Sequence, residues 1–339
     1  MAQQTEREQL LAAWRALAGD AGVEGWRTIP VAFRGPCKVY AGRHFPGNEE
    51  ALLVRFSSAR VLPVDQLPQG RGFLVTLPRI ADESSSFDWI ALSRQIAGSM
   101  DLFTMMAVDV LGTLEELRTS SDDGLVRAFL SRIRAWQEFM RRGEDGVLKS
   151  AEEVGLVGEL MFLQELVTAG LPAAIAVDAW RGPLDGLQDF ALGNGAVEVK
   201  TTVLPGEFTA TVTSLEQLDD SLIHPLFLAG VRLALNSVGR TLPSMIFEMR
   251  ALLADDPATL ADFDNRLLRA GYHQGFADRY TRRFSRESIR LFAVHEGFPR
   301  ITRANIAIAI RKVEYDINLE LVREANTDLI NALTQLGVA

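Results

Sequence analysis

The sequence predicts an α/β core that lies between an N-terminal α+β domain and a C-terminal α+β extension. Three observations support this prediction. Apolar residues recur at helical spacing over residues 149–169, which predicts a long helix. The dipeptide Asn194-Gly195 predicts a β-hairpin, because both residues tolerate the positive φ of a type I′ turn. Residues 225–235 form an almost continuous apolar run, which is typical of a strand buried on both faces.

The N-terminal part of the chain changes from a helical to a β-like pattern and back. Residues 6–19 place Leu10, Trp14 and Leu17 on one side of a short amphipathic helix. Between about 28 and 92, short β-like runs at 29–31, 37–40, 51–56 and 72–77 are separated by Gly and Pro. Residues 100–142 predict one long helix or two consecutive helices. The sequence Gly-Glu-Asp-Gly at 143–146 is the predicted boundary, so residues 1–147 form the first predicted domain.

Patterns of the same kind define the second and third predicted domains. Residues 208–212 predict a strand after the hairpin, and Ser214 is placed to cap a short helix over 215–218. Together with the helix over 149–169 and the strand over 225–235, these elements make the predicted core, residues 148–238. From residue 242 the patterns predict two helices, β-like segments at 289–295, 306–310 and 313–319, and a terminal helix. These elements form the extension, residues 239–339.

Composition narrows the class of protein. The net charge is −9, so contact with nucleic acid has to come from a local basic patch. No apolar run reaches the ~18 residues of a membrane span, and the first residues lack the pattern of a signal peptide. Cys37 is the only cysteine, which fits a reducing compartment, and the four histidines are too far apart to indicate a zinc site. The sequence predicts a cytoplasmic protein with no membrane segment.

The predicted hairpin gathers charged side chains on one face. A two-residue loop at Asn194-Gly195 would pair Asp189 with Lys200, and Ala191 with Glu198. Because strand side chains alternate between faces, the two acids and the lysine then share a face beside the small Ala191. This arrangement could hold a divalent cation and a nucleophilic water. The alternative is a solvated sheet face with an ordinary cross-strand Asp–Lys pair.

Glu159 is an unusual residue in the helix before the hairpin. It lies on the same helical stripe as Leu156 and Leu163, which should face the core. A buried carboxylate is costly unless it is paired or binds a metal ion. If this helix packs on the face that bears Asp189 and Glu198, Glu159 becomes a third acid of the site. The alternative is that Glu159 lies at the edge of the stripe and reaches water.

The order of these motifs resembles that of the PD-(D/E)XK nuclease superfamily, and in particular its prokaryotic branch of "PD-(D/E)XK motif proteins", a domain family of unknown function. The similar segments are GLVGEL at 155–160, WRGP at 180–183, DF at 189–190, EVKTT at 198–202 and EQL at 216–218, with a weaker one, PRI, at 299–301. The resemblance covers most of the chain and is sharpest between residues 155 and 218. It implies a restriction-endonuclease-like core, in which helices flank a mixed sheet.

The resemblance also implies roles for individual residues. Lys200 would hold the attacking water, help to deprotonate it and stabilise the charge that grows on the phosphate. The metal would be Mg²⁺, with Mn²⁺ able to substitute, and it would polarise a phosphodiester oxygen and activate water. The implied catalytic residues are Glu159, Asp189, Glu198, Lys200 and Gln217, and the implied metal ligands are Asp189, Glu198, Val199 and Glu159.

One departure from the family pattern concerns the first acid. The family motif places Pro directly before Asp, whereas here Pro183 is separated from Asp189 and Asp185 intervenes. We prefer Asp189, because it faces Lys200 in the predicted hairpin. Asp185 is more typical of a solvated turn residue.

A basic, aromatic region suggests where nucleic acid would bind. Nine arginines lie between residues 266 and 303, opposed by only three acidic residues and interleaved with aromatic ones. Arginine contacts phosphates in a bidentate manner, and aromatic rings stack on exposed bases. The residues assigned to nucleic-acid contact are Arg279, Arg282, Arg283 and Arg286. The alternative is an arginine-rich helix whose aromatics are core residues and whose charges pair with acids elsewhere.

By this resemblance the chain is expected to be a Mg²⁺-dependent DNA endonuclease that hydrolyses phosphodiester bonds in a restriction or phage-defence system. Its expected partners are DNA and other defence proteins, and cutting of both strands would favour a homodimer. The alternative is a non-catalytic DNA-binding or scaffold subunit with the same fold. A third hypothesis is an interaction module in which the hairpin match is accidental. The complete set of Asp189, Glu198 and Lys200 favours the enzyme.

Overall fold

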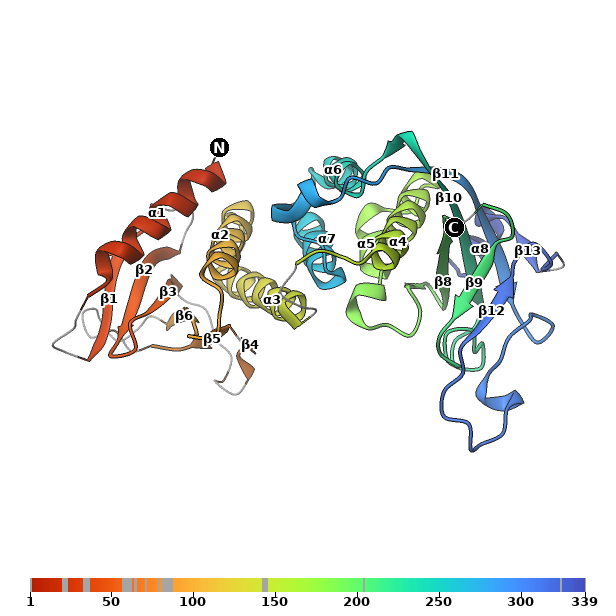
Figure 1. Cartoon of the computed structure of the whole chain (residues 1–339), viewed down its shortest axis with the longest axis horizontal. Coiled ribbons are helices and arrows are strands. Elements are labelled where there is room, and N and C mark those ends of the chain that lie inside the picture. Colours follow the sequence, from red (N-terminus) through yellow and green to blue (C-terminus); the bar gives the residue numbers. More distant parts are fainter. Residues whose placement is uncertain are drawn as a thin grey trace. The chain divides into compact units, whose positions relative to one another are not determined.

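The chain forms two compact units, Met1–Glu144 and Asp145–Ala339, each described here by itself (Figure 1). The computed structural model describes residues 2–19, 24–32, 37–56, 63, 66–70, 72–78, 80, 88–141, 146–203, 205–323 and 325–338. Residues 143–145 of the predicted boundary lie outside this part of the chain. The division into 1–147, 148–238 and 239–339 stays a prediction, and its second boundary falls inside a strand, β10 (Leu226–Arg240).

The N-terminal unit is an antiparallel sheet with helices packed against it. The strand order is β1-β2-β3-β6-β5-β4. Its strands are β1 (Gly25–Pro30), β2 (Lys38–Phe45), β3 (Glu49–Phe56), β4 (Gln69–Gly70), β5 (Phe73–Thr76) and β6 (Asp88–Arg94). Its helices are α1 (Ala2–Leu17), α2 (Met100–Glu116) and α3 (Asp122–Arg141), so the predicted helical region over 100–142 is two helices.

Buried polar contacts join these helices to the sheet and to each other. Trp14 of α1 is fully buried, and its Nε1 donates to the main-chain oxygen of Ala51 at 2.8 Å. Asp109 of α2 accepts from Arg132 and from Trp136 of α3, each at 2.6 Å. Because each buried polar group has a partner, these contacts fix the helices without the cost of an unpaired group.

The C-terminal unit is built on a mixed sheet with the strand order β13-β11-β10-β8-β7. β10 lies parallel to β8 and antiparallel to β11. The remaining strands of this sheet are β7 (Phe190–Leu192), β8 (Gly195–Thr202), β11 (Phe284–Val294) and β13 (Asn326–Thr327). The predicted strand over 225–235 corresponds to the first part of β10. Residues 226–231 are buried on both faces because layers cover each side, whereas Leu235 is exposed.

Two different layers cover the two faces of this sheet (Figure 1). The helices α4 (Ser150–Thr168), α5 (Ala173–Ala179), α6 (Leu242–Leu253) and α7 (Pro257–Ala270) form one core with Val197 and Val199 of β8. A two-stranded sheet, β9 (Thr209–Val212) with β12 (Tyr315–Asn318), forms the other core with Ala196. Short segments complete the unit: η2 (Gly182–Leu184), η3 (Gln274–Arg279), η4 (Arg303–Asn305) and α8 (Leu329–Gln335). The predicted mixed α/β class, with sheets flanked by helices, is confirmed.

None of the helices in the described ranges is both long and apolar enough to cross a lipid bilayer.

The predicted hairpin forms between β7 and β8, but its predicted register is wrong. The observed pairs are Phe190 with Val197, Ala191 with Ala196, and Leu192 with Gly195. The turn is therefore formed by residues 193–194 instead of Asn194-Gly195. The register differs by two residues, so the alternation of faces is unchanged. Asp189, Glu198 and Lys200 still belong to one face of the sheet.

Tertiary contacts explain why the turn lies one residue earlier. Gly193 takes the positive φ of the turn, 57°. The backbone N–H of Asn194 donates to the main-chain oxygen of Leu336, 3.1 Å away. A side chain at Gly195 would run into Leu336 and the main chain of Pro225. The end of α8 and the start of β10 therefore select this turn, and neither is visible in the local sequence.

Two local predictions are also wrong. The segment 215–218 forms turns and not a helix. The main-chain oxygens of Glu216 and Leu218 accept from Gln188 Nε2 and Arg300 Nη1, each at 3.1 Å, in place of helical N–H groups. The segment 306–310 forms no strand, since its alternating Ile and Ala residues find no partner strand. Ile308 in that segment is fully exposed.

Candidate active site

Four of the five residues predicted to be catalytic lie where α4, η2, β7 and β8 meet in the C-terminal unit. Glu159 comes from α4, Asp189 directly precedes β7, and Glu198 and Lys200 come from β8. Continuing the observed register by one residue pair beyond Phe190 places Asp189 opposite Glu198. Each of these side chains is positioned by a contact that can be traced.

Asp189 is fixed through both its main chain and its side chain. Its main-chain oxygen accepts the N–H groups of Arg181 at 2.6 Å and Gly182 at 3.0 Å. Its Oδ2 accepts the backbone N–H of Val199 at 2.7 Å. The η2 turn thus fixes the main chain of Asp189, and β8 fixes its carboxylate through Oδ2. Oδ1 takes part in neither contact.

Glu159 reaches the site because α4 packs closely on β8. A Cβ at the preceding residue, Gly158, would overlap the side chain of Thr201, so only glycine permits this approach. Glu159 is half-buried, and its Oε2 accepts from Trp180 Nε1 at 2.6 Å. Trp180 is fully buried and packs against Phe263, with ring centroids 6.0 Å apart.

Gly182 shows that two of the acids converge on one point. A Cβ on Gly182 would lie 2.8 Å from Glu159 Oε2 and 2.9 Å from Asp189 Oδ1. A methyl group does not fit at such distances. The η2 turn can therefore lie against both carboxylates only because residue 182 has no side chain.

Lys200 supplies the ammonium group that contacts these acids. Its Nζ lies 2.8 Å from Glu198 Oε1. The Glu198 side chain is 3% exposed and that of Lys200 is 15% exposed. The pair is thus almost removed from water, and its attraction is weakly screened.

Burial and mutual repulsion disfavour the charged forms of the three acids. Burial first, and then the neighbouring Asp189 charge, raise the pKa of Glu198 from 4.5 to about 8 against the opposing effect of Lys200. Burial likewise raises the pKa of Glu159 well above its usual range, with Asp189 adding to the rise. The pKa of Asp189 is also raised by burial, although the Val199 N–H and Lys200 oppose this shift. Three carboxyl groups therefore share one ammonium group.

The donor set fits a hard divalent cation. A divalent cation would favour the ionised forms of the three acids, and carboxylate oxygens are the ligands that Mg²⁺ prefers. In the described ranges, no three or more His, Cys, Asp or Glu side chains already form a metal-binding group. Mg²⁺ is commonly bound through one or two carboxylates, waters and substrate phosphates, so it does not require a closed protein cage.

Two further residues predicted for the site occupy different positions. Val199 lies between Glu198 and Lys200, with its side chain in the core under α4 and its N–H on Asp189. Gln217 is not hydrogen-bonded to the acids in the described part of the chain, since its Oε1 bonds to the backbone at 213–214. Its segment is nevertheless held near the site.

The predicted nucleic-acid residues mostly contact the protein itself. Arg282 forms an ion pair with Glu153 of α4 at 2.6 Å. Arg283 donates to the main-chain oxygen of Gly239 at 3.0 Å, and Arg286 pairs with Glu165 of α4. Arg279 is exposed on η3. Their predicted contact with nucleic acid stays a prediction.

Residues that sequence reasoning missed act on the positions of the acids. Trp180 is a buried core residue whose Nε1 also donates to Glu159. Arg266 is buried and donates to the main-chain oxygen of Trp180. This bond fixes the main chain of Trp180. Gly182 makes room for two carboxylates. The motif at 180–183 contained two of these residues, but only the fold showed what each of them does.

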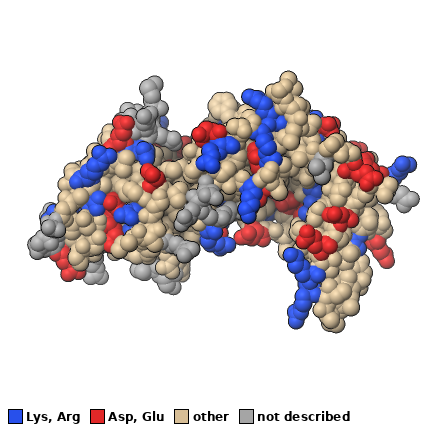
Figure 2. All heavy atoms as spheres, viewed as in Figure 1, with Lys and Arg blue, Asp and Glu red and all other residues tan. Residues whose placement is uncertain are grey.

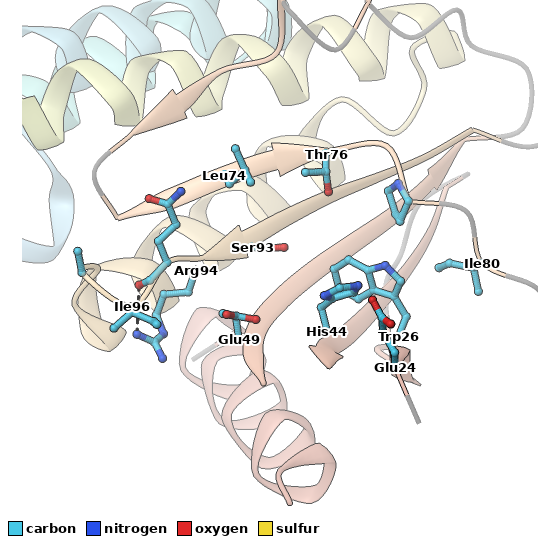
Figure 3. Close-up of a pocket in the computed structure, with 14 residues that line it drawn as sticks. Glu24, Trp26, His44, Glu49, Leu74, Thr76, Ile80, Ser93, Arg94 and Ile96 are labelled. Carbon is cyan, nitrogen blue, oxygen red and sulfur yellow. Dashed lines mark hydrogen bonds between the residues drawn. The ribbon is translucent and has the colours of Figure 1, made fainter. Parts of the chain in front are cut away.

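A separate hollow of about 1150 Å³ lies in the N-terminal unit (Figure 3). It is lined in part by Trp26 and His44, whose rings are 4.9 Å apart, and by Glu49 on the neighbouring strand. Arg94, at the other end of the hollow, is engaged by Glu50 at 2.6 Å. None of the residues predicted for the catalytic site lies in this hollow.

Comparison with known proteins gives one match. A family model described as "Putative PD-(D/E)XK family member, (DUF4420)" matches residues 10–320, which is most of the chain. No curated protein and no solved structure matches the chain.

Proposed function

Because the chain belongs to the family described as "Putative PD-(D/E)XK family member", we propose that it is a Mg²⁺-dependent DNA endonuclease. The family suggests a nuclease and DNA as the substrate, and nucleases of this type generally use divalent metals. The observation that supports the proposal is the convergence of Glu159, Asp189 and Glu198 with Lys200 in one buried cluster.

Each member of the cluster has a role in this proposal. Asp189, Glu198 and Glu159, together with Val199, would hold the cation. The bound metal would supply a Lewis acid for a phosphodiester oxygen and lower the pKa of a water molecule. The Nζ of Lys200 would hold the attacking water, help to deprotonate it and stabilise the charge that grows on the phosphate. Trp180, through its bond to Glu159, would keep the third acid in place.

The finer features of the proposal follow from the family resemblance. The C-terminal unit would contain the restriction-endonuclease-like core, and the protein would act in the cytoplasm as part of a restriction or phage-defence system. Other proteins of such a system would be its partners. Cutting of both DNA strands would be carried out by a homodimer, in which each copy contributes one site.

Cleavage of plasmid and linear duplex DNA tests the proposal. We expect Mg²⁺ and Mn²⁺ to support cleavage by the full chain and EDTA to abolish it. Glu198→Gln and Lys200→Ala should each lower the rate by about 10²-fold or more, since each removes a charge from the reacting centre. Glu207→Gln, an exposed acid, is the matched control and should retain the wild-type rate.

The same assay separates the rival functions. DNA binding without cleavage under any divalent metal would contradict the enzyme and favour a scaffold subunit with the same fold. Neither binding nor cleavage would favour an interaction module.

A further inference from the structure

An exposed basic segment of the C-terminal unit is the loop of residues 303–312, between β11 and β12. Its sequence, RANIAIAIRK, has three basic residues and no acidic one in a chain whose net charge is −9. Figure 1 shows this part of the chain projecting beyond the small sheet of β9 and β12, and Figure 2 shows basic side chains standing out along it. We call it the 303–312 loop.

Arg303 holds the two ends of the 303–312 loop together. Its Nη1 donates to the main-chain oxygen of Ile310 at 3.0 Å, and its Nη2 to that of Arg311 at 3.4 Å. Its Nε also lies 3.3 Å from Glu216 Oε1. One side chain therefore ties the two ends of the loop together and anchors them to the segment after β9. A loop ordered in advance loses less conformational freedom when it binds a partner.

The same anchor places the loop beside the candidate active site. Glu216, which receives Arg303, also accepts from Gln188 Nε2 through its main-chain oxygen at 3.1 Å. Gln188 is buried and directly precedes Asp189. The loop leads into β12, which packs with Ala196 on the sheet face that Glu198 shares. The loop therefore rises on the side of the sheet that bears Glu198 and Lys200.

The outer side chains of the loop are free to meet a partner. Arg311 and Lys312 are exposed, and among the residues whose contacts are described their side chains have no hydrogen bond or ion pair. Ile308 at the tip is fully exposed. Two exposed cations next to a projecting apolar side chain complement a polyanion in which a groove lies between two rows of negative charge. Apolar side chains of DNA-binding proteins enter such grooves.

We propose that the 303–312 loop binds duplex DNA next to the active site, with Arg311 and Lys312 on phosphates and Ile308 in the groove between them. This inference rests on the proposed nuclease function and adds to it the element that holds the substrate. Arg303 is a positioning residue in this arrangement, because its donors are already used within the protein.

Binding of a fluorescein-labelled 30-base-pair duplex to the full chain in EDTA, measured by anisotropy over a range of salt, tests the inference. Each phosphate contact contributes about 0.9 to the slope of log affinity against log salt, so Arg311→Ala/Lys312→Ala should lower that slope by about 1.8. Affinity at low salt should fall roughly tenfold. Ile308→Ala should weaken binding but keep the wild-type salt slope, since it removes no charge.

A charge-matched control is Arg15→Ala/Arg118→Ala, which removes two exposed cations from the N-terminal unit. It should leave both affinity and slope at the wild-type values. Equal weakening by the control, or a wild-type slope for Arg311→Ala/Lys312→Ala, would overturn the inference. In either case, cleavage by the wild-type chain with Mg²⁺ would still support the nuclease. Loop-dependent binding without cleavage would support the inference and contradict the nuclease. No binding in EDTA would overturn the inference, and no cleavage with Mg²⁺ or Mn²⁺ would contradict the nuclease.

Discussion

Two acids of the site, Glu159 and Asp189, are each positioned by an N–H group of a neighbouring residue. Trp180 Nε1 holds Glu159, the backbone N–H of Val199 holds Asp189, and Gly182 leaves space for Glu159 Oε2 and Asp189 Oδ1. The helical stripe of the sequence was enough to single out Glu159. The role of Trp180 could not be predicted, because a buried indole looks the same in sequence whether or not its N–H meets a carboxylate.

Gly182→Ala tests this account of the site. The added methyl group would lie under 3 Å from Glu159 Oε2 and Asp189 Oδ1, so the carboxylates have to move apart. We expect cleavage with Mg²⁺ to fall by at least tenfold, and the free energy of unfolding to fall by about 1–3 kcal/mol, as overpacking generally costs. Initial rates and urea denaturation measure the two effects.

Gly155→Ala is the matched control. Gly155 lies one turn before Glu159 in α4, and a Cβ at Gly155 would meet nothing within 4 Å. Alanine should retain full activity and stabilise the helix by about 0.5–1 kcal/mol. Full activity of Gly182→Ala would show that the two carboxylates do not depend on this space.

The raised pKa of Glu198 predicts a dependence of stability on pH. Folding raises this pKa from 4.5 to about 8, so between these values the folded protein holds a proton that the unfolded chain releases. Without metal, stability should therefore fall as pH rises through this window. Glu198→Gln cannot titrate and should show a smaller fall, measured by urea denaturation in EDTA from pH 5 to 8.5. A variant whose loss of stability over this range equals that of the wild type would contradict the raised pKa.

Among the elements, the hairpin shows how far local sequence reasoning reaches. The Asn-Gly signal correctly predicted a tight turn between two strands, and the alternation correctly placed two acids and Lys200 on one face. The local sequence could not predict the register of the hairpin, because Leu336 and Pro225, which fix the turn, come from elsewhere in the chain. The segments 215–218 and 306–310 failed for a related reason. Side chains from elsewhere in the fold bond to the main-chain oxygens of the first segment, and the second pairs with no strand in the described ranges.

The ion pair between Arg282 and α4 gives a prediction about an element contact. The Glu153 side chain is 7% exposed, so removing its partner leaves a nearly buried carboxylate unpaired. We expect Arg282→Ala to lower the free energy of unfolding by about 2–4 kcal/mol. Arg279→Ala, at an exposed position, should change it by less than about 0.5 kcal/mol. Urea denaturation of both variants decides this, and equal stabilities would show that the pair does not help to hold α4.

In the whole molecule, the sequence predicted the mixed α/β class and the family, and both are confirmed. Helical and β periodicities extend over many residues and survive local errors, which is why most elements could be predicted. The relation between the core and the extension could not, because β10 and β11 pair across the predicted boundary and belong to one sheet. Non-local pairing of this kind cannot be predicted from the sequence of either strand alone.

Titration of the full chain with Mn²⁺, followed through its five ¹⁵N-labelled indole signals, tests whether the three acids bind one cation. The Trp180 signal is assigned from Trp180→Phe, and its N–H lies on Glu159 at 2.6 Å. We predict that this signal is the first to broaden, at one metal ion per chain, and that Asp189→Asn prevents the broadening. A Trp180 signal that stays sharp at saturating Mn²⁺, or that broadens equally in Asp189→Asn, would contradict a metal site formed by these side chains.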